Sequence, residues 1–166
     1  MDFDFRIRTR VRGPLFREGA ERLRRNVREG VDRLATFARE EVLRQIRRSK
    51  PYPPIFTGTF LGSVAKSVDL APGGGVRAAV GTPVAYGPVI EEGRRPGRFP
   101  PLAPLRVWTR EVLGDEGLAF VVARKIARKG VKPRPVFRGA VPAVQERVQS
   151  VFEGVLLEGL DEGFVE

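Results

Sequence analysis

The sequence contains no cysteine and no histidine. Without cysteine the chain has no disulfide, no thiolate metal site and no thiol nucleophile. Without histidine it lacks the commonest general base and the commonest metal ligand in proteins. These two absences remove the commonest side chains of acid–base and thiol catalysis, and they direct attention to the few carboxylates, serines and glycine runs that remain.

The remaining candidates for chemistry do not have the spacing that chemistry needs. Glu91 and Glu92 are neighbours, and on the strand predicted there they point to opposite faces, so they cannot share a proton or a substrate. The glycine run at 73–75 lacks the Lys-Ser/Thr of a phosphate-binding loop. Three other acids, Asp69, Asp115 and Glu116, lack the spacing of a metal loop. We therefore expect no enzymatic activity, no cofactor and no metal.

Long apolar runs are also absent. No window has the roughly 18 consecutive apolar residues of a membrane span, and the acidic start Met1–Asp4 lacks the apolar core of a signal peptide. The 166 residues suit one domain, 1–166, and we expect no membrane contact. Arginine in place of lysine, many prolines and few amides are typical of a thermophilic or GC-rich source.

Charge is abundant and unevenly distributed. The formal net charge is +10, yet the segment 143–166 carries six acidic residues and one basic residue. A basic body with an acidic end has two interpretations. The first is ordinary solvated surface; the second is head-to-tail complementarity between copies, or a basic face beside a polyanion.

The first half of the chain predicts a strand and a long helix. Residues 2–12 alternate apolar and charged side chains, which indicates a half-buried strand. From 15 to 49 apolar residues recur every three or four positions, which predicts one helix of roughly 50 Å. Because that exceeds the width of a compact domain of this size, we expect the helix to overhang its own domain or to pack on a neighbour.

The sheet and loop region spans 55–101. We predict a short turn or helix near Ser63, strands near Ser67–Leu70 and Val76–Val80, and a third strand from Val84 to Glu91. The Arg/Pro/Gly loop Gly93–Pro101 has no apolar period, so we expect it to be disordered or ordered by a partner.

Helices follow the loop. Two short helices occupy 104–129: the first is Leu105–Leu113, and the second is Glu116–Lys129 with the apolar stripe Leu118, Val121, Val122 and Ile126. A C-terminal helix is expected from Pro142 to Leu160 (142–160). The predicted fold class is α+β: a small, mostly antiparallel sheet packed against the long N-terminal helix and the C-terminal helix, with two short helices inserted.

Three motifs follow one another in this order. The first is a T-G-x-L-x-x-S-V-like segment, the second has the form Y-x-P-x-[VI]-E-x-G, and the third contains P-R-P. Their characteristic positions are Thr57, Gly58, Leu61 and Ser63; Tyr86, Glu91 and Gly93; and Pro133, Arg134, Pro135 and Phe137. With the long helix before them, these motifs resemble the tail-completion proteins (head–tail connector, neck or minor tail proteins) of long-tailed bacteriophages.

The resemblance implies a structural virion protein, made in the host cytoplasm, that forms a ring at the phage head–tail junction. Such a ring completes the tail and joins it to the capsid connector around the DNA channel. Implied partners are other copies, the connector or adaptor, the tail-tube or tail-terminator proteins, and passing DNA. Candidate partner or DNA-channel contacts are Arg94, Arg95, Arg98, Arg134 and Arg138.

Two other classes of function stay open. One is a sequence-independent DNA-binding protein, since arginines in a Gly/Pro loop can contact phosphates without reading bases. No known nucleic-acid-binding motif is present, however. The other is a non-viral protein-interaction module, of a toxin-like or regulatory kind, with a soluble partner.

Overall fold

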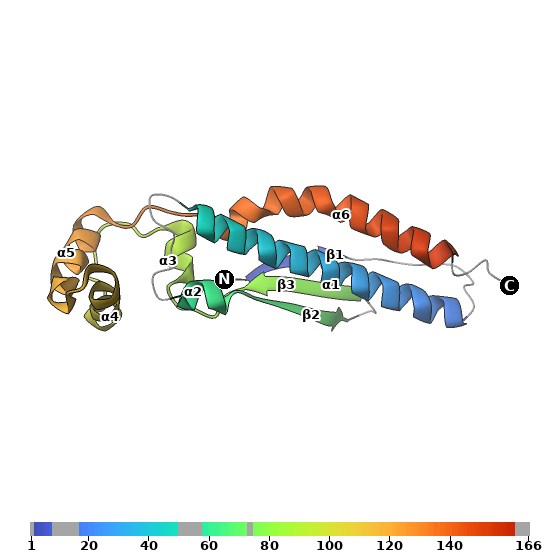
Figure 1. Cartoon of the computed structure of the whole chain (residues 1–166), viewed down its shortest axis with the longest axis horizontal. Helices are drawn as coiled ribbons and strands as arrows, with labels where there is room; N and C mark the ends of the chain where they lie inside the picture. The colour runs from blue at the N-terminus through green and yellow to red at the C-terminus, as the bar shows by residue number, and fades with distance from the viewer. Residues whose placement is uncertain (1, 8–16, 50–57, 73–74, 162–166) are drawn as a thin grey trace. The chain divides into compact units, whose positions relative to one another are not determined.

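The computed structural model has an α+β fold, and it describes residues 2–7, 17–49, 58–72 and 75–161 (Figure 1). The chain contains two compact units. We call one the sheet unit, which comprises Asp2–Val42, Ala65–Gly81 and Ala140–Glu166, and the other the motif unit, which includes Leu43–Val64 and Thr82–Gly139. Helices α1 (Arg17–Arg48) and α6 (Val136–Asp161) each contribute residues to both units.

The sheet unit contains a three-stranded antiparallel sheet with β3 in the centre. The strands are β1 (Asp2–Ile7), β2 (Ala65–Ala71) and β3 (Gly75–Gly81), in the order β1-β3-β2. Gly81 is in register with Asp2 on one side and with Ala65 on the other. The strands predicted at 2–12, 67–70 and 76–80 are confirmed as β1, β2 and β3 within the bounds given above. The predicted strand residues 8–12 lie outside the described residues, and so do the side chains of the apolar face expected for 2–12.

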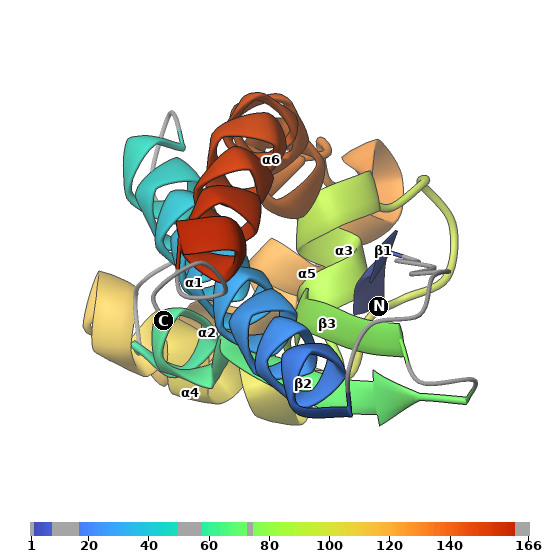
Figure 2. The ribbon, with the colours of Figure 1, turned by 90° about the vertical axis from the view of Figure 1, so that its right-hand side faces the viewer.

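The core of the sheet unit lies between the sheet and two helices (Figures 1 and 2). It is formed by six buried apolar residues, Val27, Val31, Ala35, Val76, Ala78 and Val155. The period of α1 and the alternation of β3 direct these side chains to one place. Helices α1 and α6 approach closely, because a Cβ on Gly30 would lie only 2.5 Å from Val155 Cγ2.

The long helix predicted for 15–49 is confirmed as α1, whose 32 residues span about 48 Å. Its buried stripe runs through both units: Val27, Val31, Leu34, Ala38, Val42 and Ile46. One helix therefore supplies core residues to two compact units, which accounts for a length that a single small domain would not need.

The motif unit is helical. It contains α2 (Thr59–Ser63), α3 (Gly87–Glu92), α4 (Leu102–Leu113), the short 3-10 helix η1 (Glu116–Leu118), α5 (Ala119–Lys129) and the start of α6. The two predicted inserted helices are confirmed, and Asp115 caps η1 by accepting a hydrogen bond of 2.7 Å from the Gly117 N–H. Gly114 and Gly130 follow α4 and α5 as predicted.

The third strand predicted from Val84 to Glu91 is wrong, because this segment forms helix α3. Pro88 lies in the first turn of α3, where a missing N–H costs no intrahelical hydrogen bond. Glu91 and Glu92 still diverge, but on a helix: Glu91 is buried and Glu92 is exposed.

The predicted start of the C-terminal helix at Pro142 is also wrong. Helix α6 begins at Val136, so Pro142 lies inside it. The first turn before Pro142 is held by a group from elsewhere in the chain, the Glu91 carboxylate described below. Among the helices that the structure describes, none combines the length and the apolar character needed to cross a membrane.

Candidate interaction site of the motif unit

Glu91 connects the second motif to the third. Its side chain is 4 % exposed, and its carboxylate oxygens accept hydrogen bonds from the N–H groups of Phe137 (3.0 Å) and Arg138 (2.8 Å). These donors lie in the first turn of α6, and the preceding Pro135 has no side-chain oxygen to cap them. A carboxylate at this end also complements the helix dipole. Glu91 therefore acts as the N-terminal cap of α6.

Backbone contacts hold the same two motifs together. The Arg134 N–H donates to the Ile90 carbonyl oxygen at 2.7 Å, at the end of α3. Gly93, with φ of 75° and ψ of −169°, comes next. A Cβ on Gly93 would lie 2.5 Å from the Val131 carbonyl oxygen and 2.8 Å from the Pro133 nitrogen. Only glycine permits this approach of two backbone segments.

The Arg/Pro/Gly loop is ordered by its own chain, which corrects the expectation that it is disordered or ordered by a partner. Arg94 and Val131 form a pair of backbone hydrogen bonds, N to O at 2.9 Å and 2.8 Å, and the Gly97 N–H donates to Ala127 at 2.8 Å. Backbone pairing needs no apolar side chains, so the composition of the loop did not reveal it.

The first motif packs beside the second. The Ser63 hydroxyl donates to the Phe60 carbonyl oxygen at 2.8 Å, and its oxygen lies 2.6 Å from the Thr82 hydroxyl. Phe60 is buried, and its ring centroid lies 6.1 Å from that of Tyr86. Gly58 precedes α2 with φ of 70°, Leu61 is half-buried, and Thr57 lies outside the described residues.

The motif positions therefore form a structural junction. Glu91, Gly93 and Phe137 are buried or packed against backbone, and Pro133 and Pro135 flank the extended Arg134 that pairs with α3. The Glu91 carboxylate, the Arg134 N–H and the Ser63 hydroxyl are all hydrogen-bonded within this junction. Among the residues that the structure describes, no group of three acidic, histidine or cysteine side chains could hold a metal ion.

The five candidate arginines have different surroundings. The guanidinium of Arg94 donates to the Arg98 carbonyl oxygen at 2.7 Å, so these two belong to one turn of the loop. Arg95 and Arg98 are exposed, and Arg94 is half-buried. Arg134 is half-buried, whereas Arg138 is exposed at the start of α6. The exposed members are available to a partner, and Arg94 stabilises the loop that carries them.

Helices α4 and α5 carry an apolar surface that sequence analysis missed. Six large apolar side chains of this region are 41–60 % exposed: Phe99, Val107, Val112, Leu113, Phe120 and Val121. The rings of Phe99 and Phe120 lie 5.5 Å apart, so the loop and α5 share part of this surface. We call these six residues the α4–α5 apolar surface. Neighbouring exposed apolar side chains, as Phe99 and Phe120 are, are typical of protein–protein contacts.

Val121 illustrates why this surface was missed. The predicted apolar stripe of this helix was Leu118, Val121, Val122 and Ile126, but Val121 is 60 % exposed. The buried positions of α5 are Ala119 and Ala123, with Val122 and Ile126 partly buried. Small alanines allow the closest approach to the neighbouring helix, so they face inward and the larger Val121 is turned outward.

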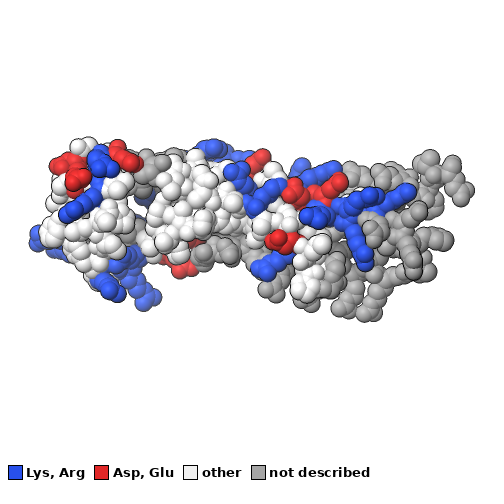
Figure 3. All heavy atoms as spheres, turned by 90° about the horizontal axis from the view of Figure 1, so that it is seen from below, with Lys and Arg blue, Asp and Glu red and all other residues white. Residues whose placement is uncertain are grey.

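The same region is basic. Residues 94–132 include ten basic and three acidic side chains, and Figure 3 shows basic groups on the surface of the part formed by α4 and α5. Arg110 pairs with Glu116 at 3.7 Å, and both side chains are well exposed. An apolar surface beside a net positive charge suits a partner that is both apolar and acidic.

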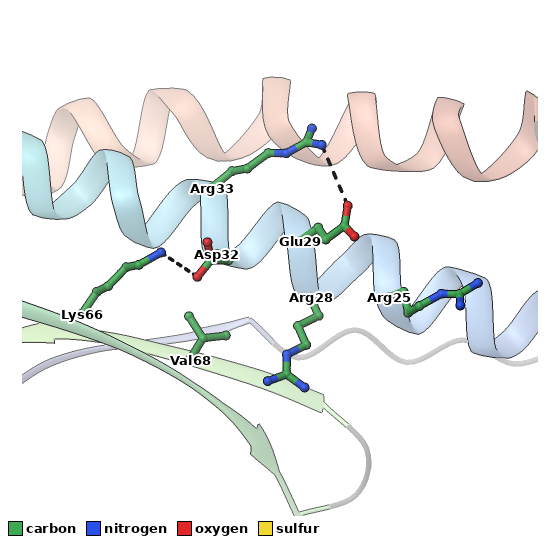
Figure 4. Close-up of a pocket in the computed structure, with 7 residues that line it drawn as sticks. All are labelled: Arg25, Arg28, Glu29, Asp32, Arg33, Lys66 and Val68. Atoms are coloured by element: carbon green, nitrogen blue, oxygen red, sulfur yellow. Dashed lines mark hydrogen bonds and ion pairs between the residues drawn. The ribbon is translucent and has the colours of Figure 1, made fainter.

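The sheet unit has a groove between α1 and β2, lined by charged side chains (Figure 4). Lys66 Nζ lies 2.6 Å from Asp32 Oδ1 and donates to the Thr36 hydroxyl at 2.7 Å. Arg33 and Glu29 are 3.9 Å apart, and Arg25 and Arg28 line the same groove. The two acids offset part of the positive charge, so this groove is a weaker candidate for an anion site than its arginine count suggests.

Comparison with known proteins gave no relative. No family model matches the chain, and neither the curated proteins nor the solved structures include a match.

Proposed function

We propose that this protein is a non-enzymatic structural subunit of a long-tailed bacteriophage, located in the neck of the virion. Copies of the chain form a ring that completes the tail and joins it to the capsid connector around the DNA channel. Its partners are other copies of itself, the connector or adaptor, and the tail-tube or tail-terminator proteins. Contact with passing DNA is independent of sequence.

The observation that carries this proposal is the meeting of the three motifs in one unit. Glu91 of the second motif caps the helix that begins in the third, and Tyr86 of the second packs against Phe60 of the first. The three segments that resemble one family therefore contact and stabilise one another. Such contacts are expected if the segments belong to one fold, and they are not expected if the resemblance is due to chance.

The α4–α5 apolar surface supports assembly rather than catalysis. A free subunit would expose several large apolar side chains, including Phe120 and Val121 at more than half of their area. Burying apolar area stabilises a contact by roughly 25 cal/mol per Å² before the cost of association is subtracted. In a virion, the permanent neighbours of the subunit would bury these residues.

Light scattering tests the assembly that this function needs. We expect the purified protein to form a closed oligomer whose mass reaches a fixed multiple of the 18.4 kDa subunit as concentration rises. Added duplex DNA should leave that mass unchanged at moderate salt, because the contacts within the ring are between protein subunits.

A different result would favour the alternative function. If the protein stays monomeric alone, gains mass only with DNA, and loses it steeply with added salt, the basic residues serve a sequence-independent DNA-binding protein. That result would contradict the proposed ring.

A further inference from the structure

We infer that copies of this chain join head to tail, with the exposed face of α5 in one copy packed against the exposed stripe of α6 in the next. The α5 face consists of Phe120, Val121, Arg124, Lys125 and Arg128. The α6 stripe consists of Glu146, Ser150, Glu153 and Leu157. The inference rests on the proposed ring assembly and adds the contact that builds it.

The α5 face is a continuous exposed side of its helix. Phe120, Arg124 and Arg128 are four residues apart, and Val121 and Lys125 lie next to them at the same spacing. All five side chains are exposed, whereas Ala119 and Ala123 on the other side are buried. The apolar members come first along the helix and the basic members follow.

The α6 stripe has the opposite order of chemistry. Glu146, Ser150, Glu153 and Leu157 are spaced by three or four residues, so they share one side of α6, and all four are exposed. Val144 and Val155 are buried on the other side, in the sheet unit. Here the acidic members come first and Leu157, which is 62 % exposed, comes last.

Arg147 is the one basic residue close to the charges of the α6 stripe on the described part of the helix. Glu153 accepts a hydrogen bond of 2.8 Å from the Gln149 amide, which is neutral. Arg147 is the single basic residue of 143–166, and its guanidinium lies 5.9 Å from the centre of the Phe37 ring. The acidic end of α6 therefore complements the basic residues of α5.

The two surfaces match in register when the helices run antiparallel. Leu157 then faces Phe120 and Val121. Glu153 lies four residues before Leu157, and Arg124 lies four residues after Phe120, so both charges are about 6 Å from the apolar contact. A contact of this kind buries apolar side chains at one end and pairs opposite charges at the other.

Every copy of the chain carries both surfaces, and the acidic and apolar α6 stripe complements the apolar and basic α5 face, so we assign a second copy as the occupant of the α5 face. Because the two surfaces are different, each copy can bind one neighbour on each side, and such a contact forms a ring when its rotation closes.

Disulfide trapping tests the contact, and the absence of natural cysteine makes the result unambiguous. Val121→Cys and Leu157→Cys are made in separate chains, which are mixed and oxidised. We expect a disulfide-linked dimer that contains one chain of each kind, in place of the 18.4 kDa monomer. The control replaces Leu157→Cys with Leu70→Cys, which is at least as exposed but lies on β2.

Charge exchange provides a second measurement. The single variants Arg124→Glu and Glu153→Arg should each lose the wild-type oligomer, because like charges then face each other. An equal mixture should regain an assembly in which the two variants alternate, because each variant supplies the surface that complements the other. Circular dichroism checks that both variants are folded, as expected since both positions are exposed.

The outcomes separate this inference from the proposed function. If the wild-type protein assembles while the Val121/Leu157 pair cross-links no better than the control, the contact is wrong and the ring stands. If the pair cross-links and the equal mixture of charge variants assembles again, but only open chains of variable length form, the contact is right and the proposed ring is wrong.

Discussion

Replacing Glu91 with alanine is expected to lower the free energy of unfolding by about 3 kcal/mol. The carboxylate is buried and accepts hydrogen bonds from the Phe137 and Arg138 N–H groups. Its removal leaves two donors at the start of α6 without their acceptor, one of them in a buried residue. The loss exceeds that of an exposed helix cap because water cannot readily take the place of the carboxylate.

Urea unfolding followed by tryptophan fluorescence measures this effect directly. Trp108 is the only tryptophan, and it lies on α4 of the motif unit. Glu92→Ala is the matched control: the neighbouring carboxylate is exposed, so its removal should change stability by less than about 0.5 kcal/mol. Equal unfolding midpoints for Glu91→Ala and the wild-type protein would contradict the role of Glu91 as the cap of α6.

Replacing Gly93 with alanine should lower the free energy of unfolding by at least about 3 kcal/mol. The new Cβ would lie 2.5 Å from the Val131 carbonyl oxygen and 2.8 Å from the Pro133 nitrogen, and both are backbone atoms that cannot rotate away. The backbone at φ of 75° and ψ of −169° is in a region that is essentially restricted to glycine. Relief requires separating the second motif from the third.

Gly114→Ala is the control for the backbone effect alone. Gly114 also has a positive φ of 75°, but a Cβ on Gly114 would meet none of the described atoms within 4 Å, so the cost should be only about 1 kcal/mol. The same urea experiment compares the two variants. If Gly93→Ala costs no more than Gly114→Ala, the close approach at Gly93 does not constrain the junction.

Much of the fold could be predicted because its signals are local. The period of α1, the alternation around Val76 to Val80 and the caps at Asp115 and Gly114 depend on neighbouring residues, and each is confirmed. The α+β class follows from these elements. Helix α3 was mistaken for a strand because its few apolar residues suit either structure, and Pro88 was taken to mark an edge strand instead of a first helical turn.

The junction could be predicted only in part, because its determinants are distant in sequence. Glu91 was singled out as a motif position, yet its bond to the start of α6 crosses 46 residues, and nothing local at Val136 signals a helix start. The order of the Arg/Pro/Gly loop depends likewise on backbone pairing with Val131. Val121 is exposed because the opposite face of α5, which carries Ala119 and Ala123, is the one that packs inward. Composition alone does not specify which face packs inward.

The measurement that tests the central claim most directly is the protein content of tailed particles. Particles are purified by density from the culture that produces them, and peptides of this chain are quantified by mass spectrometry against those of the major tail protein. We expect this chain in the particles at a constant ratio, with labelled antibody bound at the junction of head and tail. Particles that lack the chain, with all of it in the particle-free fraction, would contradict the proposed function.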